Sequence, residues 1–117
     1  MDVERFYELI NGNYQEVLSR LMNDNLIEKF LKKFKENQSL DELRKSIELS
    51  DLEKAFIEVH TLKGVSLNLS FTGLSEACSK LTEMLRGDNK LKADIYEVKK
   101  AFDIIEKEYF LVISNIE

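Results

Sequence analysis

The chain has 117 residues, of which 44% are hydrophobic and 33% charged, the proportions of a globular protein and not of a disordered one. With 17 Lys and Arg against 22 Asp and Glu, the net charge is −5, which excludes the strongly basic surface typical of nucleic-acid binding. A lone cysteine excludes an internal disulfide, and no apolar stretch reaches about 18 residues, so we expect one cytoplasmic domain over residues 1–117 without a membrane anchor.

The N-terminal third has helical periodicity on both sides of a turn signal. A short amphipathic helix is predicted by apolar residues at helical spacing, namely Val3, Phe6, Tyr7 and Ile10. The Asn-Gly-Asn sequence at 11–13 predicts a turn, and the apolar spacing from Tyr14 to Lys35 predicts a helix that the polar residues at 23–25 bend or interrupt. We interpret its basic residues as a solvated face, with an anion-binding patch as the alternative: Lys29, Lys32, Lys33 and Lys35.

Two Ser-x-x-Glu sequences mark the starts of the next two helices, because this spacing is typical of a capping box. The first predicts that Ser39 opens a helix with an apolar stripe over residues 40–47. The second predicts that Ser50 caps a helix from Asp51 to about Leu69.

Two further helices complete the pattern. They are predicted at Thr72–Leu85, with Gly87 as a stop signal, and at Lys92–Ile116. No segment alternates with period two for long, and the connections are short, so sequential helices should run antiparallel. The sequence therefore predicts an all-α fold, an up-down antiparallel four-helix bundle with an additional N-terminal helix.

The single histidine, His60, lies on the flank of the Asp51–Leu69 helix. At about 100° per residue, it falls roughly 110° from the centre of the apolar stripe, so we expect it to be accessible. Lys63 and Gly64 follow three and four residues later and adjoin it on the same surface. The patch is completed by three apolar residues, Phe56, Ile57 and Leu67.

These residue types suit phosphoryl transfer. Neutral imidazole is a nucleophile at physiological pH, and a lysine one turn away supplies positive charge for phosphoryl oxygens. Glycine within a helix costs about 1 kcal/mol relative to alanine, a cost that is offset if Gly64 lets a partner approach the histidine. Exposed Ile57 and Leu67 are best explained as docking groups.

The sequence HTLKGVS at 60–66 closely resembles the core motif of histidine-containing phosphotransfer (HPt) domains, His-x-x-Lys-Gly with a small residue two positions further on. The resemblance extends over nearly the whole chain. By position it implies that His60 is the phosphoacceptor, Lys63 the cation beside the phosphate and Gly64 the position of steric clearance, with Phe56, Ile57 and Leu67 as the docking surface.

The resemblance also implies the partners. HPt domains have no kinase or phosphatase activity of their own and exchange the phosphoryl group with an aspartate of response-regulator receiver domains, here under a hybrid sensor histidine kinase. The receiver brings the Mg²⁺, so we expect no cofactor in this chain. We expect a monomer, with a weak dimer through Ile57 and Leu67 as the alternative.

Two positions depart from the family pattern. Many members have glycine where this chain has Ser70, a change that we expect to alter the helix end and not the chemistry. Some members orient the imidazole with a glutamine from the following helix. That position falls on Thr82, which is the candidate for imidazole orientation here, with a solvated side chain on an exposed helix face as the competing interpretation.

Other classes of site fit poorly. A bundle metal site needs Glu-x-x-His pairs on two helices, but residue 57 is isoleucine and the chain has no second histidine. We interpret Cys78 as core filler, and the lack of a Gly-rich phosphate loop gives no support to nucleotide binding. The alternatives left open are a helical adaptor or degenerate HPt domain that binds receivers without transfer. The chain is also compatible with a domain excised from a larger kinase, although we favour a free-standing protein.

Overall fold

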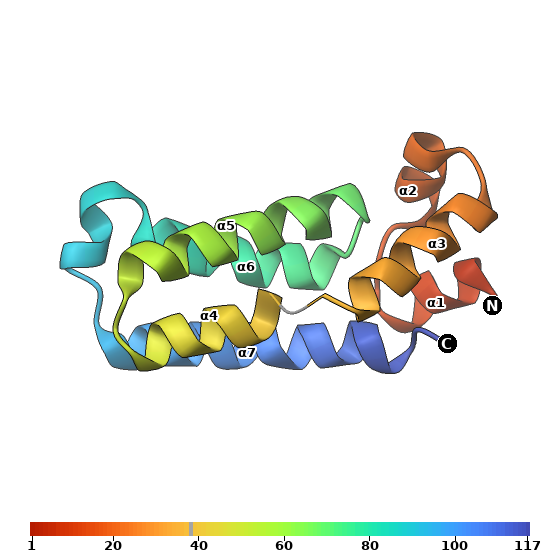
Figure 1. The fold of residues 1–117 in the computed structure, drawn as a ribbon. Coiled ribbons are helices and arrows are strands. Elements are labelled where there is room, and N and C mark those ends of the chain that lie inside the picture. Colours follow the sequence, from red (N-terminus) through yellow and green to blue (C-terminus); the bar gives the residue numbers. More distant parts are fainter. Residues whose placement is uncertain (38) are drawn as a thin grey trace.

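The computed structural model describes residues 1–37 and 39–117, and the secondary structure of this part is entirely helical (Figure 1). The elements in chain order are α1 (Val3–Leu9), α2 (Tyr14–Leu21), α3 (Asp24–Lys35), α4 (Ser39–Glu48), α5 (Leu52–Asn68), α6 (Thr72–Leu85), a 3₁₀ turn η1 (Gly87–Leu91) and α7 (Ile95–Ser114).

Helices α4 to α7 form a four-helix bundle. Each helix packs against the next, and α4 also packs against α7, which closes the bundle. The short α4–α5 and α5–α6 connections make consecutive helices antiparallel (Figure 1). The predicted all-α bundle is therefore confirmed. None of the helices described is both long and apolar enough to span a membrane.

Three helices, α1 to α3, lie at one end of the bundle (Figure 1). The sequence predicted the first of them and one longer helix after the turn, where the structure has α2 and α3. The predicted helix from Tyr14 to Lys35 is interrupted at Met22, which adopts a left-handed backbone with φ +76°. The side-chain oxygen of Asn23 then accepts a hydrogen bond from the Leu26 amide and starts α3. The polar residues at 23–25 thus interrupt the predicted helix, because the Asn23 side chain caps the first turn of α3.

Helix α4 begins at Ser39, as predicted, whereas the predicted cap of α5 is shifted by one residue. Ser50 does not cap α5: it has φ +54°, and Asp51 is the cap, whose carboxylate accepts from the Lys54 amide. Ser39 is the first residue of α4, and its amide donates to the side chain of Asn37. Ser50 lies directly before Asp51, and both side chains can cap a helix, so the prediction missed the cap by one residue.

An aromatic cluster joins the N-terminal helices to the bundle. Phe71, at the start of α6, packs edge-on against Phe34 of α3 and Phe6 of α1, with ring centroids 5.1 and 6.1 Å apart. Phe34 also contacts Tyr109 of α7 at 5.3 Å. All four rings are buried, so α1 and α3 share a core with α6 and α7.

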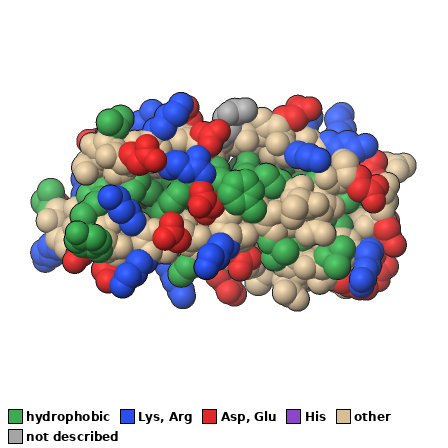
Figure 2. All heavy atoms as spheres, turned by 90° about the horizontal axis from the view of Figure 1, so that it is seen from below, with side chains coloured by type: hydrophobic (Ala, Val, Ile, Leu, Met, Phe, Trp, Pro, Cys, Tyr) green, Lys and Arg blue, Asp and Glu red, His purple; other side chains and the backbone are tan. Residues whose placement is uncertain are grey.

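Figure 2 shows the face formed by α4 and α7. Charged side chains of both signs are interspersed on it, with apolar side chains gathered along the seam, and no histidine is visible on the side drawn. This agrees with the place of the only histidine on α5, which lies on the other side of the bundle in Figure 1.

Candidate functional site

Helix α5 carries the candidate site on its outer face. The predicted stripe of α5 is fully buried at four positions, Ala55, Val59, Leu62 and Ser66, whereas Leu52 and Phe56 of the same stripe are partly buried. His60 is exposed between these positions. Among the residues described, its imidazole has no hydrogen-bond partner in the protein, so both ring nitrogens are open to another molecule.

Exposed apolar groups flank His60 along the helix. Ile57 is 58% exposed and Leu67 50% exposed, whereas Phe56 is half-buried. Ile57 and Leu67 lie about ten residues apart on α5, which at 1.5 Å per residue is roughly 15 Å. The prediction that large apolar side chains remain accessible around the histidine therefore holds for both.

The ring of Phe56 supports the imidazole. The two rings are stacked, with centroids 5.6 Å apart and an interplanar angle of 10°. The guanidinium carbon of Arg86, at the end of α6, lies 5.6 Å from the centroid of the same Phe56 ring. Phe56 thus links the histidine to a cation from another helix, and such cation–π contacts hold a guanidinium at a defined place.

Sequence reasoning did not place Arg86 at the site. The residue lies 26 positions beyond His60 and outside the motif, so no local spacing signals the contact. Arg86 reaches the Phe56 ring only because α6 packs against α5.

Two cations belong to this part of the molecule, Arg86 at the Phe56 ring and Lys63 one turn from His60 on α5. Arg86 donates to the Glu83 carboxylate at 3.0 Å. The pKa of Glu83 is held below its ordinary value, first by this hydrogen bond and, more weakly, by the charge of Lys63. Lys63 follows His60 by one helical turn on α5. It forms no ion pair among the residues described.

Gly64 has no packing reason to be glycine. The backbone there is ordinary helix, and a Cβ atom added at this position meets no atom within 4 Å. An alanine would fit and would favour the helix by about 1 kcal/mol. The absence of a side chain therefore serves nothing inside the folded chain, which is what steric clearance for an approaching molecule requires.

Thr82 lies in the interior and not on an exposed helix face. Its side chain is fully buried, and its hydroxyl donates to the carbonyl oxygen of Cys78 at 2.7 Å. The part of the chain that the structure describes contains no hydrogen bond between Thr82 and His60. The solvated interpretation was wrong because Thr82 lies one helical turn after the buried Cys78, on the buried side of α6.

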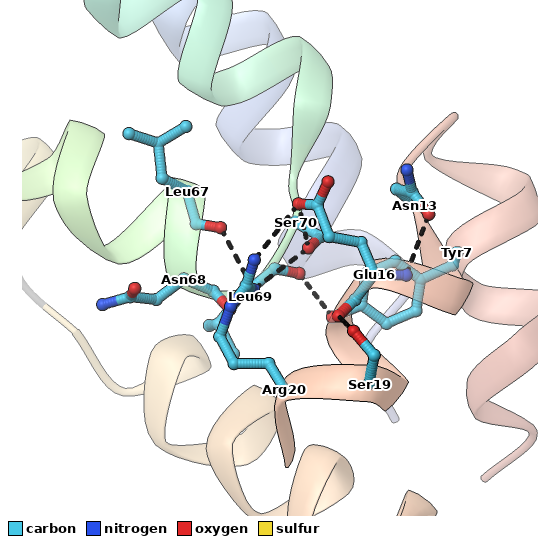
Figure 3. A network of polar contacts seen from close by, with 9 residues as sticks. All are labelled: Tyr7, Asn13, Glu16, Ser19, Arg20, Leu67, Asn68, Leu69 and Ser70. Carbon is cyan, nitrogen blue, oxygen red and sulfur yellow. Dashed lines mark hydrogen bonds and ion pairs between the residues drawn. The ribbon is translucent and has the colours of Figure 1, made fainter. Parts of the chain in front are cut away.

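The C-terminal end of α5 is fastened to α2 by a polar network (Figure 3). Ser70 has φ +57°, the left-handed conformation that glycine adopts most readily. Its hydroxyl donates to Glu16 at 2.7 Å and accepts from Arg20 at 3.2 Å. Arg20 also donates to the last carbonyl oxygens of α5, those of Leu67 and Asn68. Serine in place of the family's glycine at position 70 thus adds side-chain contacts to α2, although the left-handed backbone there is strained for a residue with a Cβ.

Other reactive groups fit no second site. Cys78 is buried, and desolvation raises the pKa of its thiol to about 12, which fits its interpretation as core filler. Among the residues described, no three His, Cys, Asp or Glu side chains are grouped so that they could hold a metal ion.

One comparison with known proteins gave a match: the family model described as Hpt domain matches residues 25–108. These residues span α3 to α7 and include His60, Lys63, Gly64 and Arg86. Neither the curated proteins nor the solved structures gave a match.

Proposed function

The chain belongs to the Hpt domain family, and from that premise we propose that His60 is its phosphoacceptor. Membership places the chain in phosphorelay signalling by histidine phosphotransfer, as a phosphocarrier that works with response-regulator receiver domains and not as a kinase. The observation that carries the proposal for His60 is its exposed imidazole, which stacks on Phe56 and has no competing hydrogen bond among the residues described. Arg86 contacts the same Phe56 ring, and Lys63 lies one helical turn after His60.

The proposed step is a displacement at phosphorus. The lone pair of one imidazole nitrogen attacks the phosphoryl group of a receiver's aspartyl phosphate, the P–N bond forms, and the P–O bond to the aspartate breaks. The aspartate leaves as a carboxylate, and the second imidazole nitrogen keeps its proton. Passage to another response regulator is the reverse step. We expect the receiver to bring the Mg²⁺, a hybrid sensor histidine kinase to stand upstream and the exchange to take place in the cytoplasm.

The neighbouring residues have separate roles in this proposal. Lys63 and Arg86 offset the negative charge of the phosphoryl oxygens. Gly64 leaves room for the receiver, and the docking surface is formed by Phe56, Ile57 and Leu67. Thr82 does not orient the imidazole in the observed arrangement, because its hydroxyl is bonded to Cys78. Phe56 takes that part through ring stacking.

An adaptor that binds receivers without transfer would need the same apolar docking groups. It would not need an exposed histidine, nearby cations and a glycine whose missing side chain faces open space. The coincidence of these features at one place on α5 favours transfer over binding alone.

The test is transfer from a panel of radiolabelled, phosphorylated receiver domains. The wild-type chain should acquire an acid-labile, alkali-stable label, and His60→Gln should acquire none. Lys63→Gln should slow transfer roughly tenfold or more. Lys107→Gln is the matched control, since it removes an exposed lysine of α7, and it should transfer at the wild-type rate.

The fold of the His60 variant must be checked beside its activity. Because His60 is exposed and outside the core, His60→Ala should change the free energy of unfolding by about 0.5 kcal/mol or less. A labelled His60→Gln protein would refute the assignment. An unlabelled wild-type chain that nevertheless binds receivers would favour the adaptor.

A further inference from the structure

A cleft separate from His60 is lined by residues of α2, of α3 and of the C-terminal end of α5. Its volume is about 380 Å³, within the range of small-molecule sites. Most of its wall is apolar and consists of Leu21, Phe30, Phe34, Val65 and Leu69. At roughly 30 Å³ for a water-sized group, it has room for about a dozen non-hydrogen atoms.

The charged groups of the cleft are of one sign. Arg20 and Lys33 line it, together with Asn37 and Asn68, and no carboxylate of the described residues does. The guanidinium of Arg20 is already bonded to Glu16 and to the end of α5. Lys33 has no ion pair among the residues described, and its ammonium lies 5.8 Å from the centroid of the Phe30 ring. Lys33 therefore supplies the available positive charge at an apolar rim.

Phe30, which lines the cleft, is unusually exposed for a phenylalanine. It is 38% exposed on a helix whose other surface positions are mostly polar or charged. A basic side chain above an accessible ring, at the mouth of an apolar cleft, provides complementary parts for a ligand with an apolar body and one negative end.

We propose that this cleft binds a small amphipathic carboxylate of about a dozen non-hydrogen atoms, with its apolar body between Phe30, Val65 and Leu69 and its carboxylate at Lys33. Asn37 and Asn68 also line the cleft, and their side-chain amides provide hydrogen-bond donors there. In this proposal Lys33 binds an anion, which is the alternative that the sequence analysis gave for the basic residues of α3. It does not depend on the chemistry of His60.

Decanoate, kept below its micelle concentration, is the probe for the full-length chain. Titration followed by backbone amide NMR should give saturable shifts grouped at Phe30, Val65 and Leu69. Decylammonium has a body of the same length and the opposite charge, and it should bind at least about tenfold more weakly. This pair of probes separates charge recognition from simple burial of an alkyl chain.

A pair of lysine variants tests whether Lys33 binds the carboxylate of decanoate. Lys33→Gln should weaken decanoate binding about threefold to tenfold, whereas Lys29→Gln, on an exposed part of the same helix, should leave it unchanged. Any of three results would overturn the proposal: no saturable shift with decanoate, shifts centred outside the cleft, or equal binding of decylammonium.

Discussion

Phe56 and His60 lie one helical turn apart on α5, and their rings are stacked at 5.6 Å between centroids. Since Phe56 also contacts Arg86, it fixes the histidine relative to a cation from α6. Phe56→Ala should slow phosphotransfer about threefold to tenfold, because a poorly placed nucleophile reacts more slowly. Its unfolding free energy should fall by about 1–3 kcal/mol, less than for a fully buried phenylalanine.

Phe56→Leu distinguishes positioning from packing. Leucine retains apolar volume and loses the flat ring, so urea unfolding should stay near that of the wild type while single-turnover transfer slows. If Phe56→Leu transfers at the wild-type rate, the stack has no part in positioning.

Gly64 gives a prediction in which stability and activity change in opposite directions. Gly64→Ala should raise the free energy of unfolding by about 0.5–1 kcal/mol, because alanine favours the helix and its Cβ meets nothing. Gly64→Gln should also be stable, yet it should transfer more slowly because its side chain occupies the space for the receiver. Urea denaturation and transfer rates measure the two effects, and an unimpaired Gly64→Gln would remove the clearance role.

Ser70 tests the cost of a left-handed backbone. Its φ of +57° is unfavourable for any residue with a Cβ, by about 1–2 kcal/mol. Ser70→Ala and Ser70→Gly both lose the hydroxyl contacts, but only glycine relieves the strain. Ser70→Gly should therefore be about 1 kcal/mol more stable than Ser70→Ala, as measured by urea unfolding. Equal stabilities would show that the backbone relaxes in the alanine variant.

Glu16 predicts a pH dependence at the α2–α5 junction. Hydrogen bonds from Ser70 and then Arg20 lower the pKa of Glu16 from its ordinary 4.5. A carboxylate with a lowered pKa in the folded state contributes stability above its unfolded pKa and loses it as the pH falls through the folded value. The urea midpoint of the wild type should thus exceed that of Glu16→Gln at neutral pH, and the difference should disappear well below pH 4.5.

A constant difference between the two proteins across this pH range would contradict the assigned cause. Parallel acid titration of Ser70→Ala provides the control, since removal of the hydroxyl takes away the leading hydrogen bond to Glu16.

The helices after residue 39 and the exposure of His60 could be predicted because both depend on the 3.6-residue period of α5 and its neighbours. The same period could not locate the break at Met22, where a left-handed residue and the Asn23 cap override a continuous apolar pattern. Capping residues were displaced for a related reason: Ser50 and Asp51 are adjacent and both can cap, and only the tertiary path selects Asp51.

The residues of the candidate site also fall into those that sequence spacing could predict and those that depend on helix packing. Lys63 and Gly64 follow His60 along one helix, so their proximity follows from sequence spacing. The contact of Arg86 with Phe56 depends on how α6 returns along α5, which no local pattern encodes. The burial of Thr82 agrees with its position one turn after Cys78 on the apolar stripe of α6, which the prediction of a solvated side chain overlooked.

The most direct test of the central claim is to locate the phosphoryl group after transfer from a phosphorylated receiver domain. Because the chain has one histidine, imidazole NMR signals of the ¹⁵N-labelled protein report on His60 alone. The account predicts that phosphorylation shifts one ring nitrogen of His60 and that the change reverses when an unphosphorylated receiver is added. Imidazole signals that stay unchanged while the chain carries a phosphoryl group elsewhere would contradict it.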